Sequence, residues 1–105
     1  MKIVDEDCLG KFRGPGICEW CGKLVSNREP HHIFARGMGA GGRLDVRENL
    51  VSLCAAFSGG DDCHASHHAG NEPTRRQLIG VVAKRQKVTP EEIEELIYRL
   101  LRTPK

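Results

Sequence analysis

Cysteine spacing constrains the fold of this chain more than any other feature. Residues 18–22 read Cys-Glu-Trp-Cys-Gly, the pattern of a zinc knuckle, in which a tight turn directs two thiolates at one ion and glycine relieves the backbone strain. A second pair must complete the tetrahedron, and Cys54 and Cys63 are the candidates, which leaves Cys8 unassigned. The predicted ligands of a structural zinc are therefore Cys18, Cys21, Cys54 and Cys63.

A redox Cys-x-x-Cys motif is the alternative interpretation of residues 18–21. That motif belongs at the start of a helix that follows a strand in a larger alternating fold, and this chain shows no such alternation. A chain of 105 residues fits one domain with a modest core, which usually needs a metal or disulfides for stability. The first residues show no apolar run after their charges, so we expect no signal peptide. We also expect no membrane span and a reducing, cytoplasmic location. In such a compartment, paired cysteines favour a bound metal over a disulfide.

The order of the predicted elements divides the single domain, residues 1–105, into three parts. Residues 1–16 carry no strong periodicity and are expected to form an arm or an extra strand, with 14–16 (Gly-Pro-Gly) as a turn or linker. Residues 17–70 form the core: short strands at 32–35 and 49–53, joined by a glycine-rich loop, and a short helix at 63–69 that Gly70 ends.

The tail, residues 71–105, is predicted to be two helices. Thr74 can cap a helix from Arg75 to about Gln86. The second helix runs from Pro90 to Arg102, because Thr89 as N-cap and a glutamate at residue 92 form a capping box. The fold class is therefore α+β, with two C-terminal helices.

All five histidines lie between residues 31 and 68. His64 and His68 are four residues apart, so on a helix they share a face and can bind one cation together; His67 competes for the same role. A third ligand has to come from His31 or His32, and the other of that pair can stay free as a general base. Neutral imidazoles suit zinc and other first-row transition metals.

Basic residues are separated from acidic ones although the net charge is only +2. The stretch between residues 74 and 87 contains no acid, and the loop between 30 and 44 also carries arginines without a carboxylate. Such segregation favours a polyanionic partner on one face, with a solvated helix face and ordinary loop arginines as the alternatives. The candidate phosphate contacts are Arg36, Arg43, Arg75, Arg76, Lys84 and Arg85.

Three motifs occur in a specific order: Pro-His-His-Ile at 30–33, Glu-Asn-Leu-Val-Ser-Leu-Cys at 48–54, and Cys-His at 63–64 followed by His68. In this combination the chain resembles the HNH endonuclease family, whose fold is the ββα-metal (treble-clef) finger. The resemblance covers residues 18–70, about half of the chain. It implies a small zinc-stabilised ββα-metal domain that hydrolyses DNA phosphodiester bonds, by nicking or by double-strand cleavage.

The same resemblance implies a role for each matching residue. Similarity to the cysteine-containing branch gives the structural zinc to the four cysteines named above. His31 and His64 would bind one catalytic divalent cation (Mg²⁺, Mn²⁺, Ni²⁺ or Zn²⁺), and His68 matches an additional ligand of all-histidine, colicin-like members. His32 would be the general base, and Asn49 would bind backbone and orient the loop that carries the base. Small phage-encoded members often have helical tails, so a bacterial or phage-infected cell is the implied host.

The chain departs from the family pattern between the last two cysteines. The usual knuckle has two residues there, whereas eight separate Cys54 from Cys63. Such an insertion can bulge outwards without moving either thiolate, because the cost of loop closure grows slowly with length. The expected partner is DNA, bound by a monomer or homodimer that needs no small-molecule cofactor. The alternative function is a non-catalytic zinc finger that binds nucleic acid and uses its histidines for a second structural metal.

Overall fold

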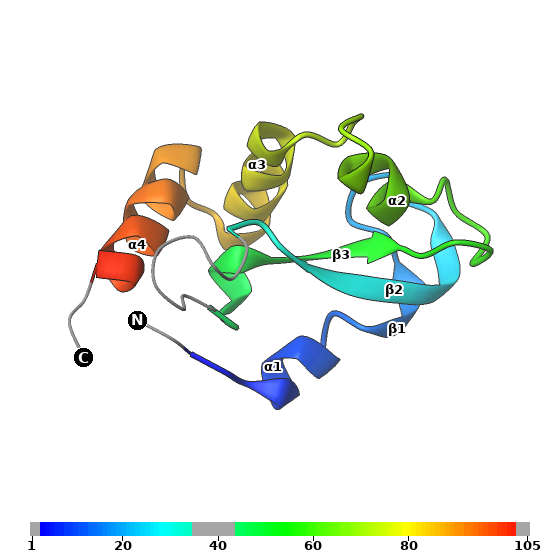
Figure 1. The fold of residues 1–105 in the computed structure, drawn as a ribbon, viewed down its shortest axis with the longest axis horizontal. Helices are drawn as coiled ribbons and strands as arrows, with labels where there is room; N and C mark the ends of the chain where they lie inside the picture. Colours follow the sequence, from blue (N-terminus) through cyan, green and yellow to red (C-terminus); the bar gives the residue numbers. More distant parts are fainter. Residues whose placement is uncertain (1–2, 35–43, 103–105) are drawn as a thin grey trace.

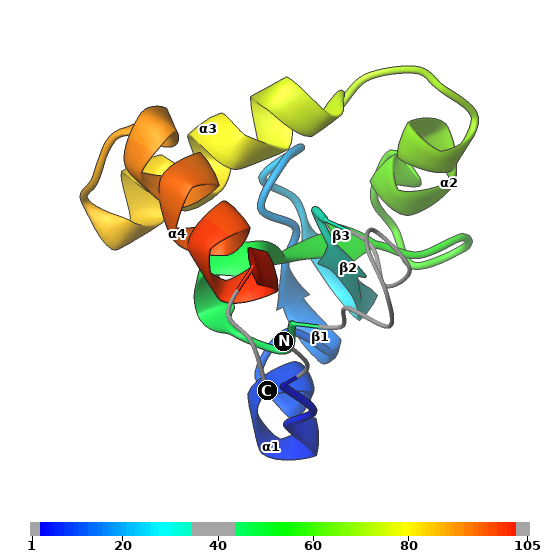
Figure 2. The ribbon, with the colours of Figure 1, turned by 60° about the vertical axis from the view of Figure 1, so that its left-hand side comes forward.

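The computed structural model describes residues 3–34 and 44–102. Its elements follow the order α1 (Glu6–Gly10), β1 (Gly14–Ile17), β2 (Leu24–His32), the 3₁₀ turn η1 (Arg47–Asn49), β3 (Leu50–Cys54), α2 (Cys63–His68), α3 (Arg75–Gln86) and α4 (Pro90–Arg102). The strands form a three-stranded antiparallel sheet in the order β1-β2-β3. Helix α1 lies on one side of this sheet, and α2 and α3 lie on the other, with α4 beside α3 (Figures 1 and 2).

The central strand β2 corrects the expected strand at 32–35. It begins at Leu24, ends at His32, and pairs with β3 in an unbroken register from Arg28 opposite Cys54 to His32 opposite Leu50. The sequence concealed this strand because residues 26–29 are all polar and show no alternation. Two neighbouring strands supply the backbone hydrogen bonds that define it.

The N-terminal residues form a helix and, at their end, the extra strand that was one of the two expectations for residues 1–16. Residues 6–10 form α1, in which the Asp5 carboxylate accepts a hydrogen bond from the Cys8 backbone at 3.0 Å. The expected turn at 14–16 is wrong, because these residues belong to β1 and pair with β2, with a register irregularity between Gly14 and Gly16. The Arg28 side chain donates to the Gly14 carbonyl at 3.0 Å and so helps to hold this glycine-rich edge strand.

The helical predictions are confirmed. Helix α2 ends at the expected place, where Gly70 has a φ of +86°, and α3 begins at Thr74 with a capping box formed with Gln77. Thr89 and Glu92 exchange the two hydrogen bonds of the second predicted box, at 2.9 and 3.1 Å. Among the described residues, no helix is both long and apolar enough to cross a bilayer.

The core lies between the sheet and the C-terminal helices. Both sides of β3 are covered, since all five of its residues are buried. Helix α3 packs onto β3 and η1, and α4 packs onto η1 and α3. The largest buried apolar side chains are Leu44, Leu50, Leu53, Leu78, Ile93, Ile97, Val51 and Val82.

Candidate metal centres

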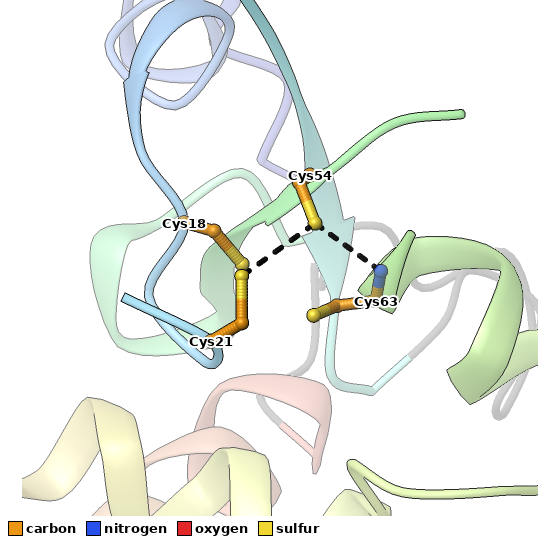
Figure 3. Close-up of side chains that lie close together, drawn as sticks. All are labelled: Cys18, Cys21, Cys54 and Cys63. Carbon is orange, nitrogen blue, oxygen red and sulfur yellow. Dashed lines mark hydrogen bonds between the residues drawn. The ribbon is translucent and has the colours of Figure 1, made fainter. Parts of the chain in front are cut away.

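Four cysteines from three separate segments form one cluster. Cys18 and Cys21 lie in the turn before β2, Cys54 ends β3, and Cys63 begins α2, and their sulfur atoms all lie within 4.8 Å of one another. Figure 3 shows the four side chains converging on a common centre. Cys8 lies in α1 and is not part of the cluster.

The backbone around the cluster has the features of a metal knuckle. In the turn, the Gly22 N–H donates to the Cys18 carbonyl at 3.0 Å, and Gly22 has a φ of +76°, a conformation that favours glycine. On the opposite side, the Cys63 N–H donates to the Cys54 sulfur at 3.3 Å (Figure 3). Backbone donors directed at a sulfur atom stabilise a thiolate, the form that binds a metal.

The insertion at 55–62 leaves this geometry intact by folding back on β2. The Ser58 carbonyl accepts the Ser26 N–H at 2.9 Å, and Lys23 pairs with Asp61 across the turn. Gly60 allows the chain to pass the cluster, because a Cβ there would lie 2.7 Å from the Cys54 sulfur. The eight residues between Cys54 and Cys63 therefore leave both sulfurs within the cluster.

Burial makes two of the four thiols, those of Cys18 and Cys63, poorer acids than a free cysteine. It raises the pKa of Cys18 and of Cys63. Burial acts in the same direction on Cys21, but backbone hydrogen bonding at Asp61 and Lys23 and the neighbouring thiols outweigh it, so the pKa of Cys21 falls to about 7. Four convergent sulfurs, three of them on buried cysteines, are the donor set of a structural zinc site.

Three histidines form a second cluster beside the first. The cluster consists of His31 on β2 and of His64 and His68 on α2. One ring nitrogen of each lies within 4.8 Å of the other two. The Nε2 atoms of His64 and His68 are 3.1 Å apart. A cation placed among the three rings could accept a lone pair from each, so the geometry fits a three-imidazole metal site.

Burial of His31 and His64 favours the neutral rings that bind a metal. Burial is the main cause that lowers the pKa of His31 to about 3, followed by the nearby His67 ring. Burial likewise lowers the pKa of His64, with His68 as the next cause. Neutral imidazoles keep the lone pairs that a metal needs.

His67, the competing candidate on α2, has a different position. Its Nδ1–H donates to the Pro73 carbonyl at 2.6 Å, and its ring packs edge-on against His31 with the centroids 4.3 Å apart. The spacing left His67 and His68 as competing candidates, and in the structure His68 lies in the three-histidine group whereas the His67 ring packs against the side of His31.

His32, the last residue of β2, points away from the cluster. Consecutive residues of a strand face opposite sides, and the register between β2 and β3 is unbroken here. The His32 Nε2 lies 2.7 Å from an Asp45 carboxylate oxygen, and the Asp45 side chain is fully buried. Sequence reasoning missed Asp45, because nothing in the local pattern connects it to a histidine 13 residues earlier.

Asn49 joins the two ends of the loop that follows His32. Its side chain is fully buried; the amide oxygen accepts the Phe34 N–H at 2.8 Å, and the amide nitrogen donates to the carbonyls of Phe34 and Leu44 at 3.2 and 3.0 Å. These contacts fix the chain directly after β2 and directly before Asp45.

The basic candidates differ in their surroundings. Arg36 and Arg43 lie outside the described residues. Arg75, Arg76 and Lys84 are exposed on α3, and the Arg75 guanidinium lies 5.3 Å from the centroid of the Phe34 ring.

Arg85, in contrast, has an internal role. Its guanidinium donates to both carboxylate oxygens of Glu19 at 2.8 Å and to the carbonyls of Arg47 and Leu50 at 2.6 and 3.0 Å. It also lies 5.1 Å from the centroid of the Phe12 ring. Arg85 thus connects α3 to the knuckle turn and to the start of β3.

Comparisons with protein-family models, with curated proteins and with solved structures give no match. The residues themselves thus carry any statement about function.

Proposed function

We propose that this protein is a metal-dependent endonuclease of the HNH type, built on a ββα-metal finger, that hydrolyses phosphodiester bonds in DNA. The observation that carries the proposal is the convergence of His31, His64 and His68 from a strand and a helix. Three protein ligands leave positions open for water and substrate, which is the arrangement of a catalytic rather than a structural metal site.

The surroundings of the cluster support the same proposal. Strands β2 and β3 with α2 give the two strands and one helix of the finger, and the four-cysteine cluster holds the start of that helix. Asn49 closes the loop between the two strands through three hydrogen bonds to its ends. These are the roles expected of the residues that match the HNH motifs.

Each residue has a defined task in the proposed reaction. A divalent cation on the three histidines would supply Lewis acidity for the scissile phosphate and for the departing 3′ oxygen. His32 takes a proton from the attacking water; it ends β2 next to His31 but faces the opposite side of the strand, so the scissile phosphate would have to lie across the strand end, between the two rings. The products would carry 5′-phosphate and 3′-hydroxyl ends.

Exposed cations on α3 are the proposed phosphate contacts. Arg75, Arg76 and Lys84 lie on the helix that follows α2, and the loop arginines Arg36 and Arg43 complete the proposed set. Arg85 is less available, because its donors are used within the protein. Contacts to phosphates position DNA without reading its sequence, so we expect little sequence preference.

A plasmid-nicking assay with Mg²⁺, Mn²⁺, Ni²⁺ or Co²⁺ tests the proposal. Wild-type protein should convert supercoiled DNA to nicked or linear forms, and His32→Ala should be about 10²- to 10⁴-fold slower, the usual contribution of a general base. DNA binding should persist in this variant, since its metal ligands are intact. Wild-type protein that binds DNA but cuts it with none of these ions would instead support the non-catalytic zinc finger.

A further inference from the structure

Asp45 is a buried carboxylate that contacts His32 on one side and the N-terminal segment on the other. One carboxylate oxygen lies 2.7 Å from the His32 Nε2, and the other accepts the Asp5 N–H at 2.8 Å. The Asp45 backbone N–H donates to the Ile3 carbonyl at 2.8 Å, and Ile3 forms a parallel bridge with Leu44. The N-terminal segment therefore fixes the place and orientation of this carboxylate.

We propose that Asp45 is a positioning residue that sets the tautomer of His32, so that Nε2 carries the proton and Nδ1 offers the lone pair. This inference deepens the proposed nuclease function and rests on it for its catalytic consequence. A carboxylate oxygen can only accept a hydrogen bond, so the ring nitrogen that faces it must donate. In the neutral ring the other nitrogen is then the proton acceptor.

The exposure of the two side chains agrees with this division. The Asp45 side chain is 0% exposed, whereas 21% of the His32 side chain remains exposed, so the ring is held at one nitrogen without being enclosed. Burying a carboxylate costs free energy unless donors compensate it, and the donors to Asp45 include His32 and the Asp5 N–H, from separate parts of the chain. Holding a base in one tautomer and one orientation is the contribution that a buried aspartate makes in Ser-His-Asp hydrolases.

Asp45→Asn is the informative substitution, because it keeps the shape of the side chain while it removes the negative charge and changes the hydrogen-bonding pattern. An amide has one acceptor oxygen, while the carboxylate accepts from both Asp5 and His32. If the oxygen stays with the Asp5 N–H, the amide NH₂ faces His32 Nε2, which must then accept. The proton of the neutral ring moves to Nδ1, and the base loses the lone pair that it needs.

The test is ¹⁵N NMR of the imidazole nitrogens in the full-length, zinc-loaded protein at a pH where the ring is neutral, with the His32 signal assigned by its loss in His32→Ala. Wild-type protein should show a proton on Nε2, and Asp45→Asn should shift the tautomer towards Nδ1–H. Asp7→Asn, the same charge change in α1, is the control and should leave the tautomer unchanged. A wild-type His32 with its proton on Nδ1 would overturn the proposal without any variant.

Kinetics adds a second readout. Asp45→Asn should lower the maximal nicking rate about 100-fold with little change in the DNA concentration at half-saturation, and it should cause no further loss when combined with His32→Ala. A further loss in the double variant would mean that Asp45 acts on the fold rather than through His32. If the tautomer responds as expected but wild-type protein cuts no DNA, the positioning inference stands and the nuclease proposal fails.

Discussion

The cysteine cluster and the histidine cluster are joined in the sequence at Cys63 and His64, yet they differ in burial. Cys18 and Cys54 are fully buried and Cys63 is 3% exposed, whereas His64 is half-buried and His68 is exposed. Three of the four cysteines are buried and Cys21 is half-buried, an arrangement that suits a structural metal site. The histidine cluster includes one exposed ring, and a cation held there would leave room for a substrate. Under the proposed function, neighbouring residues of one short helix thus have separate tasks, stability and chemistry.

Helix α2 makes the histidine cluster depend on the cysteine cluster. The helix has only six residues, and its N-cap, Asp62, adopts a left-handed conformation and makes no side-chain capping bond. A helix this short is not stable by itself, so tertiary anchors must hold it. Cys63, as a member of the cysteine cluster, provides such an anchor at the start of the helix. Loss of the cysteine cluster should therefore disrupt the histidine cluster, whereas loss of a histidine should leave the cysteine cluster intact.

The largest expected effect therefore comes from the cysteine cluster. Cys21→Ser removes one of the four sulfurs, and because a structural zinc supplies folding free energy of about 10 kcal/mol or more, the variant should unfold or aggregate. Zinc content by mass spectrometry under native conditions and helicity by circular dichroism measure this. Cys8→Ser is the matched control, since Cys8 lies outside the cluster, and it should change neither quantity. If metal-free protein kept its helicity and melted cooperatively, the cysteine cluster would not be the site that stabilises the fold.

The histidine cluster should respond in the opposite way. His64→Ala should abolish DNA cleavage through lost metal affinity, while the zinc on the cysteines, the helicity and the melting temperature stay close to wild type. Added Mn²⁺ or Ni²⁺ at high concentration should restore part of the activity, because two imidazoles remain. Titration calorimetry with the added cation and the nicking assay measure both effects.

His67→Ala is the matched control on the same helix. His67 bonds to Pro73 and packs against His31 rather than joining the cluster, so its loss should reduce the rate much less than the loss of His64. Equal losses in the two variants would mean that His67 is a ligand and that the assignment of His68 is wrong.

Ligand spacing was the part of the site that the sequence could predict. A Cys-x-x-Cys with a following glycine, and two histidines four residues apart on a helix, define local geometry without any knowledge of the fold. The helix caps at Thr74 and Thr89 were equally local and equally well predicted. Local rules succeed where the deciding contacts lie within one turn.

Contacts between distant segments explain what sequence reasoning missed. The first half of β2 is polar and shows no strand pattern, and it is a strand because it pairs with β1 and β3. The Gly-Pro-Gly segment pairs with β2 as part of β1, although its composition is typical of a turn. Arg85 was predicted to contact phosphate, yet its carboxylate partner, Glu19, is 66 residues away. Strand pairing and the Arg85–Glu19 ion pair both join distant segments, and such contacts leave no periodic signal in the sequence.

The smallest effect, and the most specific to DNA binding, concerns the exposed cations of α3. Reversing Arg76 and Lys84 to glutamate should weaken binding to all DNA sequences alike, because phosphate contacts carry no sequence information. Each lost contact should also flatten the dependence of log K on log salt concentration by about 0.9. Fluorescence anisotropy over a series of salt concentrations measures both quantities, and neither metal cluster should change, since neither residue belongs to one.

A charge-matched control decides whether α3 is the DNA surface. Reversing Lys11 and Arg13 makes the same change in net charge next to α1, on the opposite side of the sheet (Figure 2). If DNA lies across α2 and α3, only the α3 reversal should reduce the salt slope, whereas the control should lower affinity slightly through its long-range charge. Equal slopes in the two double variants would place the DNA elsewhere and leave α3 as a solvated face, with the histidine cluster still available to a substrate approaching from another direction.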